Sequence, residues 1–138
     1  MSTALDRLKN LTAKISSYEV ARKENMAALE SLYHALGVDE KVPEFADLFE
    51  FKAMNLAGIS LADDTLGTPH EGKYVQIIAI TYDREAKVRN KNSSLAYFGR
   101  AEKLEPTQRD AVVAFVLRWR FEKSFRTLEH YHTLLQRF

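Results

Sequence analysis

The chain has 138 residues, of which 46% are hydrophobic, 28% are charged and none is cysteine. This length suits one folded domain, and the composition excludes a disordered tail, a collagen-like repeat and a disulfide-bonded scaffold. Without cysteine, thiol catalysis, thiolate zinc sites and thiol-based redox switching are excluded as well. The formal net charge of +1 conceals an uneven distribution of charge along the chain.

We expect residues 4–36 to form one long helix. Apolar side chains recur at seven-residue intervals in two rows, which is typical of a helix that buries one stripe. The rows are Leu8, Ile15, Leu29 and Leu36, and Leu11, Tyr18 and Leu32. Thr3 or the serine before it can cap the start, and Gly37 can end the helix. Arg22 and Asn25 interrupt the stripe, and such polar positions weaken a helix seam but can fix its register.

A second long helix is predicted over residues 107–137, with Pro106 ending the preceding loop and Thr107 as the cap. Its first half is apolar nearly all round, so we expect that half to lie between two layers of structure. Its second half is amphipathic and should keep one solvated face. The main apolar stripe consists of Ala114, Leu117, Phe121, Phe125, Leu128, His132 and Leu135.

The intervening region, residues 43–103, predicts a short helix and a small antiparallel sheet. Residues 74–82 are the clearest strand, because β-branched and aromatic residues are concentrated there. Residues 55–61 and 94–98 are further strand candidates. Residues 43–54 fit either a helix or a strand, and a short helix is favoured because proline at position 43 suits a helix start.

Together these elements predict a single α+β domain over residues 1–138. We expect two long antiparallel helices, with the sheet and the short helix inserted between them in the sequence. The long helices could pair within one chain or across a dimer. The stripes carry more apolar surface than one two-helix contact covers, so we expect a non-catalytic homodimer, an adaptor, regulator or inhibitor that docks on a partner protein. The interface candidates are Leu8, Ile15, Leu29, Tyr131, Leu135 and Phe138.

The basic residues gather in segment 84–103, whereas segment 39–72 has eight acidic and two basic side chains. Lysines, arginines and nearby aromatic residues can grip phosphates and stack on bases, so a nucleic-acid-binding regulator is an alternative function. The other interpretation is a solvated hairpin tip that balances the acidic segment. The candidate contact residues are Arg84, Lys87, Arg89, Lys91 and Arg100, followed by Tyr97 and Phe98 as stacking residues.

The loop over residues 63–71 concentrates polar groups and gives a second alternative, a small metal- or ligand-binding enzyme. Its carboxylates and imidazole belong to Asp63, Asp64, His70 and Glu71, but their spacing matches no known calcium or two-histidine motif. The simpler interpretation is a polar connection between strands. His130 and His132 point to different sides of a helix and cannot chelate one metal together, and His132 falls on the apolar stripe as a core histidine. No catalytic residue, metal or cofactor is predicted.

Arg118 and Arg120 flank Trp119 in the most apolar part of the chain. A buried arginine needs a carboxylate or carbonyl partner, because an unpaired buried charge is costly. We expect an internal ion pair, with an anion-binding arginine as the alternative. The candidate carboxylates are Glu44, Asp47 and Glu50.

The longest apolar runs, residues 77–80 and 112–117, are far shorter than the roughly 20 residues that span a bilayer. The first eleven residues include charged side chains, so they do not form an uncharged secretory core. The sequence therefore predicts a soluble, cytoplasmic protein without a membrane segment.

Overall fold

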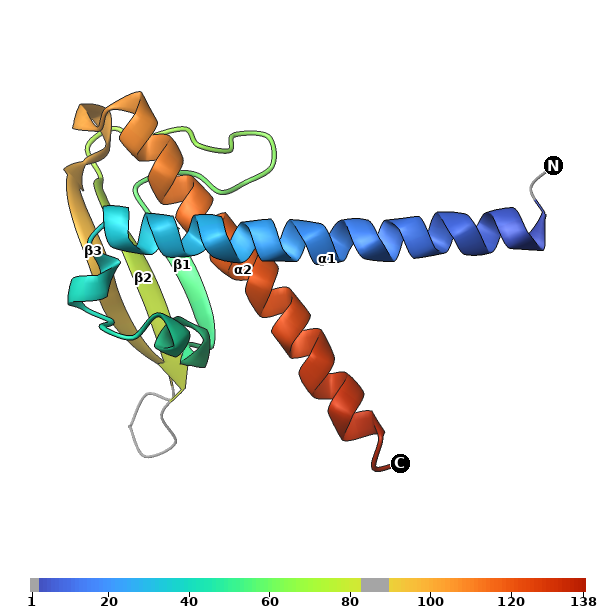
Figure 1. The fold of residues 1–138 in the computed structure, drawn as a ribbon. Helices are drawn as coiled ribbons and strands as arrows, with labels where there is room; N and C mark the ends of the chain where they lie inside the picture. Colours follow the sequence, from blue (N-terminus) through green and yellow to red (C-terminus); the bar gives the residue numbers. More distant parts are fainter. Residues whose placement is uncertain (1–2, 83–89) are drawn as a thin grey trace.

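Two long helices flank a three-stranded antiparallel sheet in the order of the chain (Figure 1). The computed structural model describes residues 3–82 and 90–138, without the side chains of residues 15, 16 and 90. The α+β class is the one that the sequence predicts. The elements are α1 (Ala4–Ala35), η1 (Val38–Glu40), η2 (Phe45–Glu50), β1 (Ala53–Ala57), β2 (Tyr74–Tyr82), β3 (Asn90–Arg100), η3 (Ala101–Lys103) and α2 (Pro106–Leu135), the η elements being 3-10 helices.

Helix α1 begins and ends at the predicted signals. The Thr3 side chain accepts the Asp6 N–H at 3.1 Å, and the Asp6 carboxylate accepts the Thr3 N–H at 3.2 Å. This reciprocal capping box satisfies main-chain donors that the first turn would otherwise leave unpaired. After Ala35 the chain turns at Gly37, which has a φ of +73°. Glycine adopts this left-handed conformation at little energetic cost.

Helix α2 starts one residue earlier than predicted, and Thr107 is not its cap. Pro106 is the first helical residue, and Glu105 precedes it in an extended conformation. Proline suits the first helical position because its φ is already helical and the N–H that it lacks would have no partner within the helix.

The sheet has the order β1–β2–β3, and β2 has the predicted bounds. Strand β1 covers residues 53–57, so it starts two residues and ends four residues earlier than the expected segment 55–61. It ends early because Gly58 turns the chain at a φ of +86°. Strand β3 is longer than the expected 94–98, since its polar first half also pairs with β2. Residues 43–54 divide between the short helix η2 and the start of β1, so both interpretations hold for part of this segment.

The core lies between one face of the sheet and the helices. Alternate residues of β2 are buried, which places Val75, Ile77 and Ala79 on the inner face. They belong to the same buried cluster as Leu29 and Tyr33 of α1 and the following residues of α2: Val112, Val113, Phe115, Val116 and Trp119. The first half of α2 is therefore packed as predicted on most sides. The predicted main stripe is not its buried face, because Leu117 and Leu128 are exposed.

Polar side chains of α2 attach the helix to the segment that leads into the sheet. Trp119 Nε1 donates to the Leu48 oxygen at 2.7 Å, and Lys123 Nζ donates to the Phe49 oxygen at 2.6 Å. Arg120 donates to the Met54 oxygen in β1 through Nε at 3.1 Å and Nη2 at 2.9 Å. The expected ion pair with Glu44, Asp47 or Glu50 is thus replaced by main-chain carbonyl partners, which also satisfy a guanidinium.

The long helices cross instead of packing side by side along their length, so the predicted antiparallel pairing is wrong in this respect (Figure 1). The C-terminal half of α1 joins the core, and its N-terminal half projects away from the rest of the molecule. Leu29 is fully buried in its own chain and is not an open interface residue. The seven-residue rows show that a stripe can be covered, but not which element covers each part of it.

Candidate functional site

The crossing point of α1 and α2 is held by a group of charged side chains around Glu122. Arg22 donates to the two Glu122 oxygens from Nε at 2.8 Å and from Nη2 at 3.0 Å. Arg126, one turn along α2, donates to Glu122 Oε2 at 2.8 Å. Arg22 also pairs with Glu129 and lies over the Phe125 ring, 5.1 Å from its centroid. One arginine of α1 therefore binds two turns of α2.

The Glu122 side chain is 2% exposed, so its charge depends on these partners. Burial raises the pKa of the Glu122 carboxyl, but the hydrogen bonds from Arg22 and Arg126 outweigh burial and hold this pKa below its usual value. The hydrogen bonds that Arg22 donates to Glu122 and Glu129 raise the pKa of Arg22. The pair stays ionised and fixes where the two helices cross.

Asn25, the second polar interruption of the α1 stripe, is buried beside this group. Its Nδ2 donates to the Arg118 main-chain oxygen at 2.9 Å, and Arg118 Nη1 donates to Asn25 Oδ1 at 3.2 Å. The two positions that break the apolar stripe of α1 thus supply its polar contacts with α2. A single buried asparagine can fix the register of a helix pair in the same way.

Beyond the crossing point, both helices present uncovered apolar side chains. We call residues 4–21 of α1 the α1 arm and residues 125–138 the α2 end. In the arm, Leu8 is 59% exposed, and in the α2 end Leu128 is 68% exposed. Among the described side chains, the exposed large apolar residues of these two parts are Leu5, Leu8, Leu11, Tyr18 and Val20, and Leu128, Tyr131, Leu135 and Phe138.

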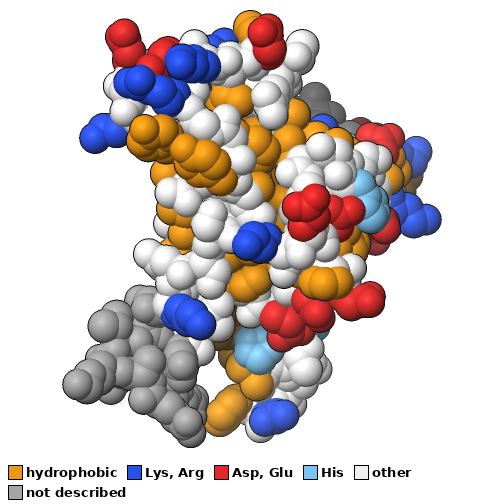
Figure 2. Space-filling model, turned by 90° about the vertical axis from the view of Figure 1, so that its left-hand side faces the viewer, with side chains coloured by type: hydrophobic (Ala, Val, Ile, Leu, Met, Phe, Trp, Pro, Cys, Tyr) orange, Lys and Arg blue, Asp and Glu red, His pale blue; other side chains and the backbone are white. Residues whose placement is uncertain are grey.

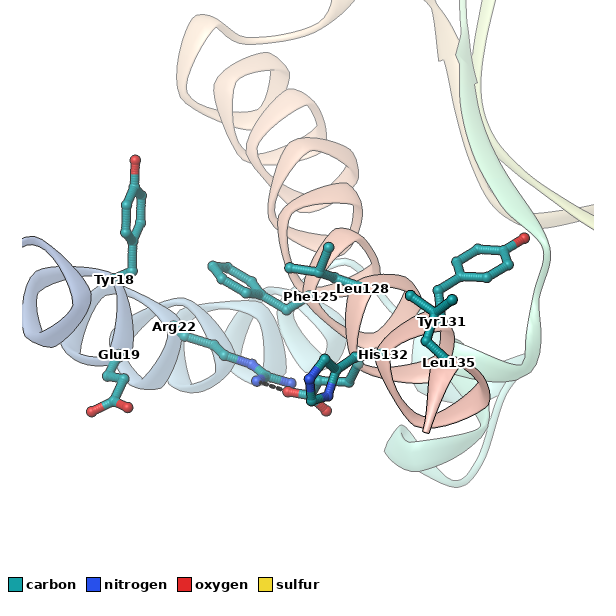
Figure 3. Close-up of a pocket in the computed structure, with 9 residues that line it drawn as sticks. Tyr18, Glu19, Arg22, Phe125, Leu128, Tyr131, His132 and Leu135 are labelled. Carbon is teal, nitrogen blue, oxygen red and sulfur yellow. Dashed lines mark hydrogen bonds and ion pairs between the residues drawn. The ribbon is translucent and has the colours of Figure 1, made fainter. Parts of the chain in front are cut away.

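The arm and the α2 end form the two walls of an open groove of about 590 Å³ (Figure 3). Tyr18 stands on the α1 wall, and Phe125, Leu128 and Tyr131 stand on the α2 wall. The Arg22–Glu129 ion pair lies at the angle between the helices. The groove walls are therefore mainly apolar, with Glu19 and His132 as polar members and the ion pair where the helices meet, a composition suited to receiving another helix.

The structure separates the predicted interface residues. Leu8, Tyr131, Leu135 and Phe138 are exposed, and Tyr131 and Leu135 line the groove. The side chain of Ile15 lies outside the described part of the chain. The sequence prediction of the interface does not include Tyr18, Phe125 and Leu128. All three belong to the predicted apolar stripes, and that pattern could have identified them as interface residues.

The basic candidates are only partly described. Arg84, Lys87 and Arg89 lie outside the described residues. Lys91 is exposed on β3, and the exposed Arg100 pairs with Glu102 at 3.0 Å. Backbone N–H groups of Glu102 itself and of Gly72 donate to the Glu102 carboxylate, and together with the nearby charges of Arg100 and Lys103 they lower the pKa of Glu102.

The loop over residues 63–71 is a turn-rich connection with exposed polar groups: Asp63, Asp64, His70 and Glu71. Within residues 3–82 and 90–138, no three histidine or acidic side chains lie close enough together to hold a metal ion. His132 is exposed and not a core histidine as expected, and its Nε2 lies 3.4 Å from Gln136 Nε2. It belongs to the groove wall, because its part of the stripe faces away from the core.

Comparisons of the chain with protein-family models, curated proteins and solved structures find no match. Among the described residues, no helix has the length and apolar character needed to cross a membrane.

Proposed function

We propose that the chain is a non-catalytic protein–protein interaction module, of the adaptor, regulator or inhibitor kind, that works as a homodimer. The observation that carries the proposal is the apolar surface shared by the α1 arm, the groove and the α2 end. The second copy would lay its α1 arm along this surface, and the first copy would do the same in return.

The exposed area of the chain supports such a contact. A compact monomer of 15.8 kDa exposes about 7,300 Å². This chain exposes 9904 Å², which is about 2,600 Å² more than a compact monomer. Each partner in a standard interface buries about 800 Å², so the excess is large enough for a stable dimer.

The pattern of the arm favours a second copy as the occupant. Leu8, Leu11 and Tyr18 continue the two rows whose later members, Leu29 and Leu32, pack inside the chain. Such rows pair best with rows of the same period on another helix. In a two-fold symmetric dimer, one contact covers the arm of each copy, because the same patch is used twice.

The experiment is a mass measurement by light scattering on the full chain at several concentrations. The unaltered chain should have twice the mass of one chain. Leu8→Asp combined with Leu128→Asp should give a folded monomer, because both residues are exposed within one chain. Ala13→Asp is the matched control, since it adds the same charge to the arm about 180° away from the Leu8–Leu11 rows.

A monomer at every concentration would overturn the proposal. Dissociation by Ala13→Asp as strong as that by the leucine pair would also contradict it, because the apolar rows would not be the contact. Leu29→Asp should instead unfold the chain, since that side chain is fully buried.

A further inference from the structure

The three strands of the sheet contain no acidic residue, although the chain has 19. Cations stand within or next to them: Arg100 ends β3 opposite Tyr74, and Lys52 directly precedes β1. The charges within the strands are thus all positive, whereas segment 39–72, which includes β1, has eight acidic and two basic side chains. An anionic chain could lie along this surface without meeting a carboxylate of the strands.

Two tyrosines form a pair on the outer face of the sheet. Because Val75 and Ile77 point into the core, Tyr74 points outward, and the register places Tyr97 opposite Gln76 on the same face. The ring centroids of Tyr74 and Tyr97 are 5.9 Å apart, with 33° between the ring planes. The tyrosines remain 54% and 60% exposed, so this end of the sheet offers aromatic surface to a ligand.

A third exposed tyrosine marks the other end of the same face. Tyr82 is eight residues along β2 from Tyr74, a span of about 27 Å in an extended strand. Lys52 Nζ lies 5.6 Å from the centroid of the Tyr82 ring. Between the two ends, Asn92 and Ser94 of β3 lie opposite outward-facing residues of β2 and add neutral hydrogen-bonding groups.

Figure 2 shows the molecule from the side where β3 lies in Figure 1. Apolar side chains spread over the middle of this surface, and acidic side chains lie mainly in its right-hand half. Glu102, which follows β3 in the chain, is paired with Arg100, so its charge is compensated.

We infer that the outer face of the sheet binds single-stranded nucleic acid. Bases stack on Tyr74 and Tyr97, and phosphates contact Arg100 at one end of this face and Lys52 at the other. Aromatic rings accept any base, and cations beside them follow the phosphate backbone, which together give binding without sequence preference. This site is separate from the groove and does not depend on the proposed dimer. The sequence indicated Tyr97 and Arg100 but not Tyr74, which only the strand register brings beside Tyr97.

The test is fluorescence anisotropy of the full chain with labelled 20-nucleotide dT and U strands at low salt. Binding of either strand is the expected result, and comparison of the dT strand with the U strand distinguishes DNA from RNA as the ligand. Replacing both tyrosines by alanine should weaken binding roughly 30-fold or more, since stacking contributes about 1–3 kcal/mol per base. Tyr74→Phe with Tyr97→Phe is the matched control and should bind within about twofold of the unaltered chain, because the rings remain.

Salt titration adds an independent readout. Lys52→Gln with Arg100→Gln should lower the slope of log affinity against log salt by about 1.4, because each phosphate contact with a single strand contributes about 0.7. Failure of both strands to bind at low salt overturns the inference. Binding that survives the alanine pair, or equal affinity for a 20-base-pair duplex, also overturns it, because stacking on unpaired bases would then not be the mode of contact.

Discussion

Replacement of Glu122 by glutamine tests whether the ion pairs at the helix crossing stabilise the fold. The carboxylate accepts two hydrogen bonds from Arg22 and one from Arg126, at 2.8 to 3.0 Å, while it is almost completely buried. In Glu122→Gln, one oxygen becomes an NH₂ group that faces a guanidinium donor. Arg22 and Arg126 then lose this anionic partner, and Arg22 keeps only its pair with the exposed Glu129.

The expected loss follows from the burial of these partners. Removing one member of a fully buried ion pair costs about 3–5 kcal/mol. Arg22 and Arg126 are partly exposed, so water replaces some of the lost interaction. We therefore expect the free energy of unfolding to fall by about 2–3 kcal/mol.

Urea unfolding followed by circular dichroism, at one fixed protein concentration, measures this change. Glu129→Gln is the control, because Glu129 pairs with the same Arg22 but is largely exposed, and it should cost less than about 1 kcal/mol. A Glu122→Gln effect below about 0.5 kcal/mol, or equal effects of both variants, would refute the reasoning that burial makes the Glu122 pairs important.

The remaining predictions concern acid sensitivity and two local packing features. The pKa of Glu122 is lower in the folded chain than in the unfolded chain, where it is about 4.3. The carboxylate therefore stabilises the fold above the unfolded pKa, and this stabilisation is lost as the pH falls through the folded pKa. In urea titrations at several pH values, Glu122→Gln should remove this part of the pH dependence of the free energy of unfolding. Trp119→Phe removes the donor to the Leu48 oxygen and should cost about 2 kcal/mol by the same assay, whereas no loss would mean that the bond contributes nothing. Gly58→Ala should cost about 3 kcal/mol in thermal melts, because its Cβ would lie 2.6 Å from a β2 carbonyl oxygen, whereas Gly67→Ala, with the same left-handed φ but open space, should cost about 1 kcal/mol. Equal costs at the two glycines would refute the steric argument.

Long, regular patterns in the sequence predicted the elements well. The seven-residue rows from Leu8 to Leu36 gave α1 within one residue, because the period is sustained over many turns. The run of β-branched residues gave β2 at its observed bounds. Shorter elements shifted, since a single residue such as Gly58 decides where β1 ends.

The arrangement of the helices was not predictable from the same rows. A row shows that one side of a helix can be covered, but not what covers it. Leu8 and Leu29 belong to the same row, yet Leu8 is exposed to solvent and Leu29 is buried in the core. The residue that fixes the crossing is Glu122, whose partner Arg22 is 100 positions away in the chain. Only the folded structure brings these two together, and the groove between the helices exists because of where they cross.

The contact between Arg120 and the Met54 oxygen has a consequence for misassembly. Strand β1 is at one side of the sheet, where an unpaired main chain can recruit strands from other molecules and start amyloid-like stacking. A recruited strand that used this oxygen would have to displace a guanidinium that holds it with two hydrogen bonds. Arg120 therefore makes this oxygen less accessible to a recruited strand on that side.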